Sequence, residues 1–305
     1  MPTTRDATRD RHSGYYTSLL QRLEAGLKGT RQFTGPSTDG QAAAQAVAEI
    51  DLEIENMRAA WEWAAVRGQI EQIDQAMDSL AIYYRWRSHH AQGKTVFRRA
   101  AERLSEVVSP TPSGEEARVL ARLWVWQSRL WGDDRDRDVL VQSLSLLEGR
   151  APASQEPAVD TRPARALILQ QMGWLEGSND PEVAGEYCRE SLALHEALGD
   201  RYGMAEVLDT LGTLVRGQGA YDEARRLYER CLLLRREIGD TRGIARSLLR
   251  LSSIAQFQGQ PAESARLARE GIAISRSIGD QGGVASGLSD LALTLLWLGE
   301  FAQAE

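Results

Sequence analysis

The sequence predicts an all-α fold, a solenoid of stacked antiparallel helical hairpins. A segment of about 40 residues recurs three times in the C-terminal half, and each copy carries two amphipathic helical patterns. The N-terminal half favours long helices, since no proline lies between Pro36 and Pro110. A hairpin with two apolar faces cannot bury both alone, so successive hairpins are expected to stack.

The repeat is visible in three aligned segments. LGDRYGMAEVL begins at Leu198, IGDTRGIARSL at Ile238 and IGDQGGVASGL at Ile278, a spacing of 40 residues each time. The columns that match include Gly199/Gly239/Gly279, Asp200/Asp240/Asp280, Gly203/Gly243/Gly283, Leu211/Leu251/Leu291 and Gly219/Gly259/Gly299. So many matches at one period indicate one structural unit repeated along the chain.

Each repeat has recognisable helix boundaries. In the Gly-Asp pair, Gly suits the left-handed position that ends a helix, and Asp accepts from the free amides that begin the next. Apolar residues then recur at helical spacing up to about Arg216, GQGAYDEA turns the chain, and a second helix follows. Pro261 falls in the turn or first helical position of its repeat, where a missing N–H costs little.

These residues resemble the tetratricopeptide repeat. The resemblance rests on Leu211-Gly212, Gly219-x-Tyr221, Ala224, the aromatic Tyr228 and the small Cys231, although the period exceeds the usual 34 residues. It implies a right-handed solenoid and is strong from about Thr161 to Glu305. We expect an irregular helical region at 1–150, a linker-like connection at 151–163 and repeats at 164–305. Because the last repeat stops at GEFAQAE, partway into its second helix, a longer protein is expected.

The N-terminal half shows helical patterns with a broken period. Helices are predicted near His12–Leu27, Asp39–Arg67, Ile70–His90, Thr95–Val108, Glu115–Trp131 and Asp134–Leu147. RHSGYYTSLLQRLEAGL and EIDLEIENMRAAWEWAAVRG are similar to the segment that begins the repeats of STAND-type regulators, which are signal-transduction ATPases. That similarity covers roughly Arg11 to Val107. It implies a nucleotide-binding module that precedes the repeats in such proteins and is absent from this sequence.

Composition excludes several classes of protein. The net charge of −7 argues against direct nucleic-acid binding, which needs a basic face. The charged N-terminus lacks a signal-peptide core, and no run approaches the roughly 20 apolar residues of a membrane span. Cys188 and Cys231 are too few for a disulfide framework or a cysteine-rich metal site. A cytoplasmic protein without membrane contact is expected.

Three short stretches imitate catalytic or metal sites. Gly93-Lys94-Thr95 ends like a phosphate-binding loop, but the first motif position is Ser88 rather than Gly, so we expect a turn between helices with the next helix near Thr95. DDRDRD, which includes Asp134, Asp136 and Asp138, opens like a calcium loop, but Val139 replaces the required Gly and a helix N-terminus is expected. His89-His90 has no third ligand at suitable spacing. No cofactor, metal or catalytic residue is therefore predicted, and the chain is not expected to be an enzyme.

The second helices of the repeats are expected on the outside. Arg225, Arg226, Arg230, Arg235 and Arg236 form a basic helix, for which a solvated face is favoured over a specific anionic partner. His195 shares its column with Arg235 and Ser275, so exposure is expected there too. Cys188 and Cys231 fall on packing columns and are expected in the core.

The resemblance places a binding surface on the first helices. Carrying over the inner-groove positions by register gives Glu206, Asp209, Thr213 and Arg216 in one repeat and Arg246, Leu249, Ser253, Gln256 and Phe257 in the next, and Arg250 is a further candidate for partner contact. The same positions in the last repeat include Leu293, Leu296 and Trp297, which either form an apolar patch or pack against a further repeat. The expected partner is a protein or peptide, with a small-molecule inducer as a further possibility. Two functions stay open: the sensor module of a STAND-type regulator, and a free-standing adaptor or peptide-sensing regulator.

Overall fold

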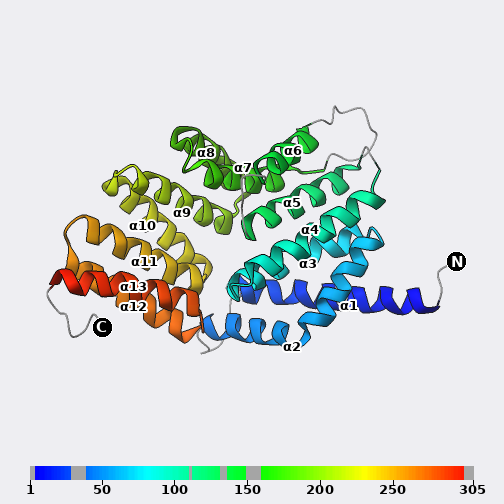
Figure 1. Cartoon of the computed structure of the whole chain (residues 1–305), viewed down its shortest axis with the longest axis horizontal. Coiled ribbons are helices and arrows are strands. Elements are labelled where there is room, and N and C mark those ends of the chain that lie inside the picture. The colour runs from blue at the N-terminus through cyan, green and yellow to red at the C-terminus, as the bar shows by residue number, and fades with distance from the viewer. Residues whose placement is uncertain (1–3, 29–38, 110–111, 131–135, 149–158, 299–305) are drawn as a thin grey trace. The chain divides into compact units, whose positions relative to one another are not determined.

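The computed structural model describes residues 4–28, 39–109, 112–130, 136–148 and 159–298, and these ranges contain helices and no strands (Figure 1). The all-α prediction is therefore confirmed. The contacts group the chain into two units, the first comprising 1–27 and 46–179 and the second comprising 28–45 and 180–305. Each unit has its own core.

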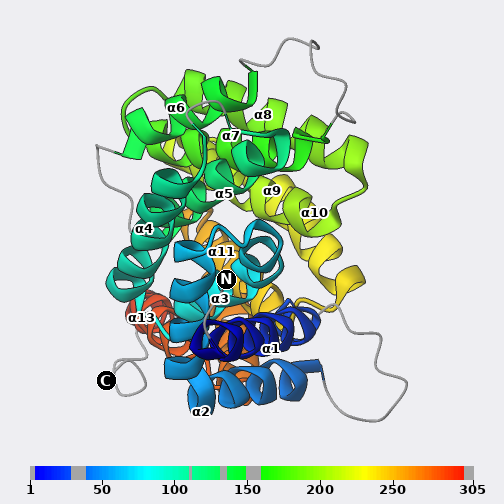
Figure 2. The ribbon, with the colours of Figure 1, turned by 90° about the vertical axis from the view of Figure 1, so that its right-hand side faces the viewer.

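The first unit is built from long helices. Their bounds are α1 Thr4–Leu27, α2 Asp39–Val66 (which begins in the second unit), α3 Ile70–Trp86, α4 His90–Val107, α5 Gly114–Leu130, α6 Asp136–Glu148 and α7 Arg162–Glu176. In the first unit α1 lies beside α2 (Figure 2), and the Ser13 hydroxyl donates to the Ala60 carbonyl at 3.0 Å. Aromatic side chains contribute to its core, since Trp61 and Tyr84 are fully buried. The expected linker falls mostly on 149–158, outside the described residues.

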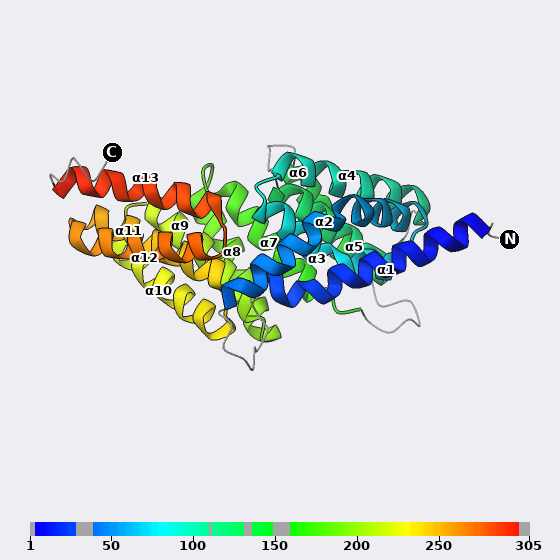
Figure 3. The ribbon, with the colours of Figure 1, turned by 90° about the horizontal axis from the view of Figure 1, so that it is seen from below.

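The second unit contains the repeats. Its helices are α8 Pro181–Leu198, α9 Arg201–Gly217, α10 Tyr221–Ile238, α11 Thr241–Phe257, α12 Pro261–Ser277 and α13 Gln281–Leu298. Each packs on the next, and α13 also contacts α11 (Figure 3). The final GEFAQAE stretch lies outside the described residues. Stacked hairpins are thus observed where the 40-residue period predicts them.

The Gly-Asp pairs act as the sequence predicts. Gly199, Gly239 and Gly279 have positive φ values of 66°, 76° and 73°, the left-handed conformation that ends a helix. Asp200 Oδ1 accepts from the Gly203 amide at 3.0 Å, Asp240 from Gly243 at 2.8 Å and Asp280 from Gly283 at 3.2 Å. One residue therefore ends a helix and the next begins another, which fixes the hairpin-to-hairpin connection.

The core of the second unit explains the Leu211-Gly212 pair of α9. Tyr228 of α10 is fully buried against apolar residues of α11, including Leu251 and Ile254. Its ring lies so close to Gly212 of α9 that a Cβ there would be 2.6 Å from a ring carbon. The Leu211-Gly212 pair is therefore a packing requirement of the hairpin.

Two glycine substitutions in α9 test this packing. Gly212→Ala is expected to lower the free energy of unfolding by about 1–3 kcal/mol, because the added methyl overlaps the buried Tyr228 ring. Gly217→Ala is expected to raise it by up to about 1 kcal/mol, because no atom lies within 4 Å of the added methyl and alanine favours a helix. Chemical denaturation of both variants measures the difference. Equal effects would contradict the proposed Gly212–Tyr228 contact.

Candidate functional site

Five predicted groove residues line one pocket in the second unit. Arg216 from α9 and Arg246, Leu249, Arg250 and Ser253 from α11 border a cavity of about 340 Å³. The other lining residues come from α11, α12, α13 and the turns between them: Arg242, Ser275, Asp280, Gly283, Ser286 and Asp290. The pocket therefore joins three successive first helices at one place.

Glu206 and Asp209 lie behind the pocket, where they hold its arginines. Arg235, whose side chain is fully buried, places Nη2 3.1 Å from Glu206 Oε1 and Nη1 3.4 Å from Asp209 Oδ1. Arg246 also pairs with Glu206, and its Nε lies 3.7 Å from Asp209 Oδ2. Arg250 Nε lies 3.9 Å from Asp209 Oδ1. Two carboxylates thus position three guanidinium groups.

The buried charges shift the pKa values of the carboxyl groups in opposite directions. Burial works to raise the pKa of Asp209, but Arg246, Arg235 and Arg250 outweigh it and hold this pKa below its ordinary value. Burial raises the pKa of Asp240 despite the nearby Arg235. The surrounding arginines therefore favour the charged form of Asp209.

Four residues that line the pocket carry a buried donor atom without a hydrogen bond. The Nε atoms of Arg216, Arg246 and Arg250 and the hydroxyl of Ser275 are buried with no hydrogen-bond partner in the described part of the protein. On the other wall, burial raises the pKa of Asp290 although Arg250 and Arg216 act to lower it. Unmatched buried donors cost free energy, so a ligand that supplies acceptor oxygens would be favoured here.

The remaining predicted groove residues do not line this pocket. The Thr213 hydroxyl bonds the Asp209 carbonyl at 2.9 Å and lies 3.1 Å from the Tyr228 hydroxyl, so it is used within the hairpin. Phe257, half exposed, stacks on Tyr221 with ring centroids 5.0 Å apart. Gln256 is partly buried in the last turn of α11. At the end of the described repeats, Leu293, Leu296 and Trp297 are exposed.

The expected exposure of His195 and Arg235 is wrong. Both side chains are buried. His195 packs over Gly203 in the first turn of α9, and Arg235 packs over Gly243 in the first turn of α11. His195 Nδ1 lies 2.9 Å from Asp200 Oδ2, and Arg235 Nη1 donates to the Gly243 carbonyl at 3.1 Å. The sequence signal for this burial is the recurrence of a polar residue every 40 positions together with a glycine eight residues later. Gly203, Gly243 and Gly283 have no side chain and so leave room for these polar residues.

The sequence reasoning also missed four pocket residues: Arg242, Ser275, Asp280 and Asp290. Asp280 was assigned only to capping, yet it also accepts from Arg242 Nε at 3.1 Å. Ser275 belongs to a second helix, which was assigned to the outside. These residues reach the pocket because adjacent hairpins overlap.

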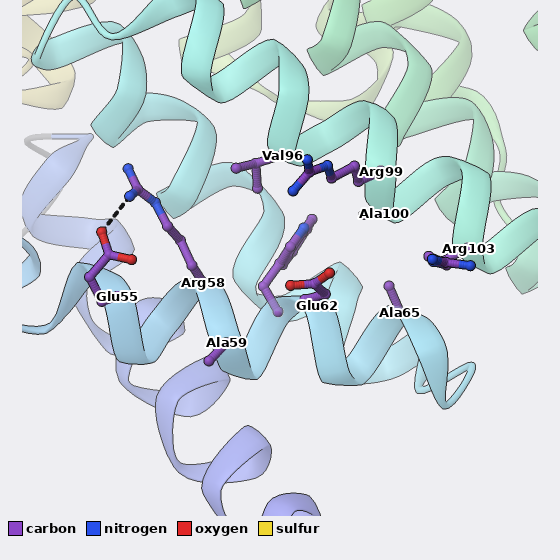
Figure 4. A pocket seen from close by; sticks show the side chains of 10 residues that line it. Glu55, Arg58, Ala59, Glu62, Ala65, Val96, Arg99, Ala100 and Arg103 are labelled. Carbon is purple, nitrogen blue, oxygen red and sulfur yellow. Dashed lines mark hydrogen bonds and ion pairs between the residues drawn. The ribbon is translucent and has the colours of Figure 1, made fainter.

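A second cavity, of about 310 Å³, lies between α2 and α4 in the first unit. Figure 4 shows Arg99 and Arg103 of α4 across from Glu55, Arg58 and Glu62 of α2. Arg58 pairs with Glu55 at 2.5 Å, and Arg103 pairs with Glu106 of its own helix at 3.0 Å. No sequence-predicted site residue lines this cavity.

The stretches that imitate chemical sites have structural roles. Gly93 lies within α4, not in a turn, because α4 begins at His90 and a Gly93 Cβ would come within 2.9 Å of Tyr84. Lys94 pairs at 3.3 Å with the buried Asp136, the residue that begins α6. Among the described residues, no group of His, Cys, Asp and Glu side chains could hold a metal ion.

The two cysteines are buried, as predicted. Burial raises the pKa of Cys188 to about 12, and burial also raises the pKa of Cys231. Thiols with raised pKa values carry little thiolate and are poor nucleophiles.

A family comparison agrees with this architecture. The model of the tetratricopeptide repeat matches residues 165–237 and 204–277. Residues 165–277 form tetratricopeptide repeats. The match begins in the first turn of α7 and ends at the last residue of α12, so it includes α11 and Ser275 of α12.

Solved structures show the same fold at low sequence identity. A STAND protein with a tetratricopeptide repeat sensor from Pyrococcus horikoshii is 14% identical, with a TM-score of 0.54, over 86% of this chain and 43% of that one. A Rap protein complexed with competence and sporulation factor is 12% identical, with a TM-score of 0.52, over 98% and 95%. BtubC from P. vanneervenii is 16% identical, with a TM-score of 0.50, over 79% and 89%.

No curated protein sequence matches this chain. Within the described ranges, no helix combines the length and apolar character needed to cross a lipid bilayer.

Removing the buried guanidinium tests the charge cluster. Arg235→Ala is expected to lower the free energy of unfolding by about 3 kcal/mol or more, because it leaves buried carboxylates partly uncompensated. Arg236→Ala is the matched control, since the neighbouring side chain is half exposed and its nearest carboxylate lies 3.9 Å away. Chemical denaturation should show little change for the control. A loss as large for Arg236→Ala would contradict the assigned role of Arg235.

Acidification provides a second test of the cluster. Because the pKa of Asp209 is lower in the folded protein, its ion pairs stabilise fully above the ordinary aspartate pKa of about 3.9 and weaken as pH falls through the folded-state value. Asp209→Asn should therefore be less stable than the unmodified protein at pH 7, and the gap should shrink toward pH 3. Denaturation curves at both pH values measure the gap; a constant gap would contradict the prediction.

Proposed function

We propose that this protein is a non-catalytic binding module that captures a peptide or protein segment on the first helices of its tetratricopeptide repeats. The observation that carries the proposal is the pocket formed by Arg216, Arg246, Arg250 and Ser253, with its buried donors. A small-molecule inducer that offers acceptor oxygens would meet the same donors.

Charge and rigidity support recognition at this pocket. Asp209 and Glu206 hold Arg246 in place before any ligand arrives, so binding would immobilise fewer free side chains. Arg216 has no ion-pair partner within 4 Å among the described residues, which leaves its charge available to a ligand. Charged hydrogen bonds from such groups are stronger than neutral ones.

The proposal places the module in a STAND-type signalling or transcriptional regulator, as its sensor. The shared fold with the Pyrococcus horikoshii STAND protein supports this assignment, and that protein extends well beyond the matched region. A cytoplasmic location and a separate nucleotide-binding domain belong to the same proposal. A coding sequence for such a domain directly upstream in the gene would favour it.

A free-standing adaptor or peptide-sensing regulator is the second candidate. The fold is shared with the Rap protein that was crystallised with competence and sporulation factor, over nearly the full length of both chains. A gene that encodes these repeats without an upstream nucleotide-binding domain would favour this candidate.

Selection from a random dodecapeptide display library tests the binding proposal. The chain is expected to enrich peptides whose affinity falls about tenfold or more in Arg216→Ala, because a charged hydrogen bond contributes about 1.5–3 kcal/mol. Arg216→Ala should leave the fold intact, since this side chain makes no ion pair with a described residue within 4 Å. Fluorescence anisotropy with the enriched peptides measures affinity.

Arg226→Ala is the matched control, because this arginine is exposed on α10 and lies outside the pocket. It should bind the same peptides as the unmodified chain does. The absence of any enriched peptide, or an equal loss in both variants, would overturn the proposed binding surface.

A further inference from the structure

The last turn of each second helix carries a buried polar residue that differs from repeat to repeat. The residues are His195, Arg235 and Ser275, spaced 40 apart, and all three are at most 1% exposed. Each faces the same pair on the following helix, an aspartate cap and a glycine: Asp200 and Gly203, Asp240 and Gly243, or Asp280 and Gly283. The aspartate and the glycine are thus the same in all three repeats, whereas the buried polar residue differs.

The size of the occupant decides whether a pocket forms. His195 covers Gly203 and reaches Asp200, and Arg235 covers Gly243 and extends to Ser247, Glu206 and Asp209. Ser275 covers Gly283 but ends at its hydroxyl, which lines the pocket. The pocket therefore occupies the position in which the two preceding repeats place a large polar side chain.

The walls of this position change charge between repeats. Glu206 and Asp209, which hold the Arg235 guanidinium, correspond by register to Arg246 and Leu249. Arg246 and Leu249 both line the pocket, together with Arg216 and Arg250. The site that receives a cation in one repeat is thus bordered by arginines in the next.

We infer that the pocket above Ser275 receives the carboxylate side chain of an acidic peptide. Arg216, Arg246, Arg250 and Ser275 all line the pocket, and their guanidinium and hydroxyl groups can donate to a carboxylate. Leu249 offers an apolar contact for the methylene stem. This inference rests on the proposed peptide-binding function and names the class of ligand.

A doubly charged phosphate fits this pocket less well. Asp280 and Asp290 lie on the α13 side of the same cavity, and each would repel additional negative charge. Asp290 can accept a backbone N–H group from a peptide whose acidic side chain points toward the arginines, whereas the two oxygens of Asp280 already accept from Gly283 and Arg242. A peptide with a single carboxylate can therefore pair with the arginines and also donate a hydrogen bond to the α13 side of the pocket.

Filling the pocket with the residue type of an earlier repeat provides the test. Ser275→His should place an imidazole over Gly283 and beside Asp280, as His195 lies over Gly203 and beside Asp200, so the hairpin should still fold. Ser277→His is the matched control, two residues away on the exposed side of α12. Circular dichroism and thermal melting check both variants.

The binding probes are two peptide pools, nine residues long and random except for a central Glu in one pool and a central Gln in the other. The unmodified chain and Ser277→His should retain at least tenfold more of the Glu pool, and Ser275→His should lose that preference. Ser286→Tyr provides a second obstruction from α13, since Ser286 is exposed at the pocket, and should give the same loss. Inorganic phosphate, added as a competitor, should displace the Glu pool only weakly.

The outcomes separate the two proposals. Retention of both pools without a Glu preference, or a Glu preference that survives in Ser275→His and Ser286→Tyr, would overturn the carboxylate pocket and leave the peptide-binding surface standing. Displacement by phosphate as strong as by acidic peptide would assign the pocket to a free anion and overturn the inference. Retention of neither pool would overturn the inference together with the proposed function.

Discussion

The buried guanidinium of Arg235 sets the central constraint on the second unit. A charge removed from water must meet opposite charge nearby, and Glu206 and Asp209 of α9 meet it together with Asp240 at the start of α11. Three helices are therefore fixed to one side chain. Because the same two carboxylates also pair with Arg246, the charge balance of the interior determines where a pocket arginine is held. Stability and the geometry of the candidate site thus depend on one network.

The repeat separates what builds the fold from what builds the site. The left-handed glycine, the aspartate cap and the small residue one turn into each first helix recur without change in the three aligned segments. These residues set how one hairpin follows another. The position represented by His195, Arg235 and Ser275 varies on this constant frame. His195 and Arg235 fill that position, whereas Ser275 borders a cavity there.

Much of the fold follows from local sequence, whereas the site depends on contacts between hairpins. The helices of the repeats are predictable because each has its own capping residues and apolar period. Register placed Arg216, Arg246, Leu249 and Ser253 on one surface, and these four do line the pocket, together with Arg250. The burial of Arg235 was not predictable in the same way, because its carboxylate partners lie 26 and 29 residues away and meet it only after stacking. The charge pattern along α10 alone favours an exposed Arg235, because it contains no information about Glu206 and Asp209. The same limitation misplaced Gly93, whose packing against Tyr84 and Leu130 comes from two other helices.

A solenoid of identical repeats would fill every equivalent interior position in the same way and would offer a ligand only a periodic surface. Specific recognition needs a place where neighbouring repeats differ, and the step from Arg235 to Ser275 is such a place. Two differences between these repeats act together. Ser275 stands where the preceding repeat has Arg235, and Arg246 and Leu249 stand where it has Glu206 and Asp209. Either change alone would be ineffective, since an arginine opposite Arg246 would meet repulsion and a serine opposite two carboxylates would leave buried negative charge uncompensated. The combination leaves a cavity lined by arginines and by Ser275, which is the arrangement that an acidic side chain can complete.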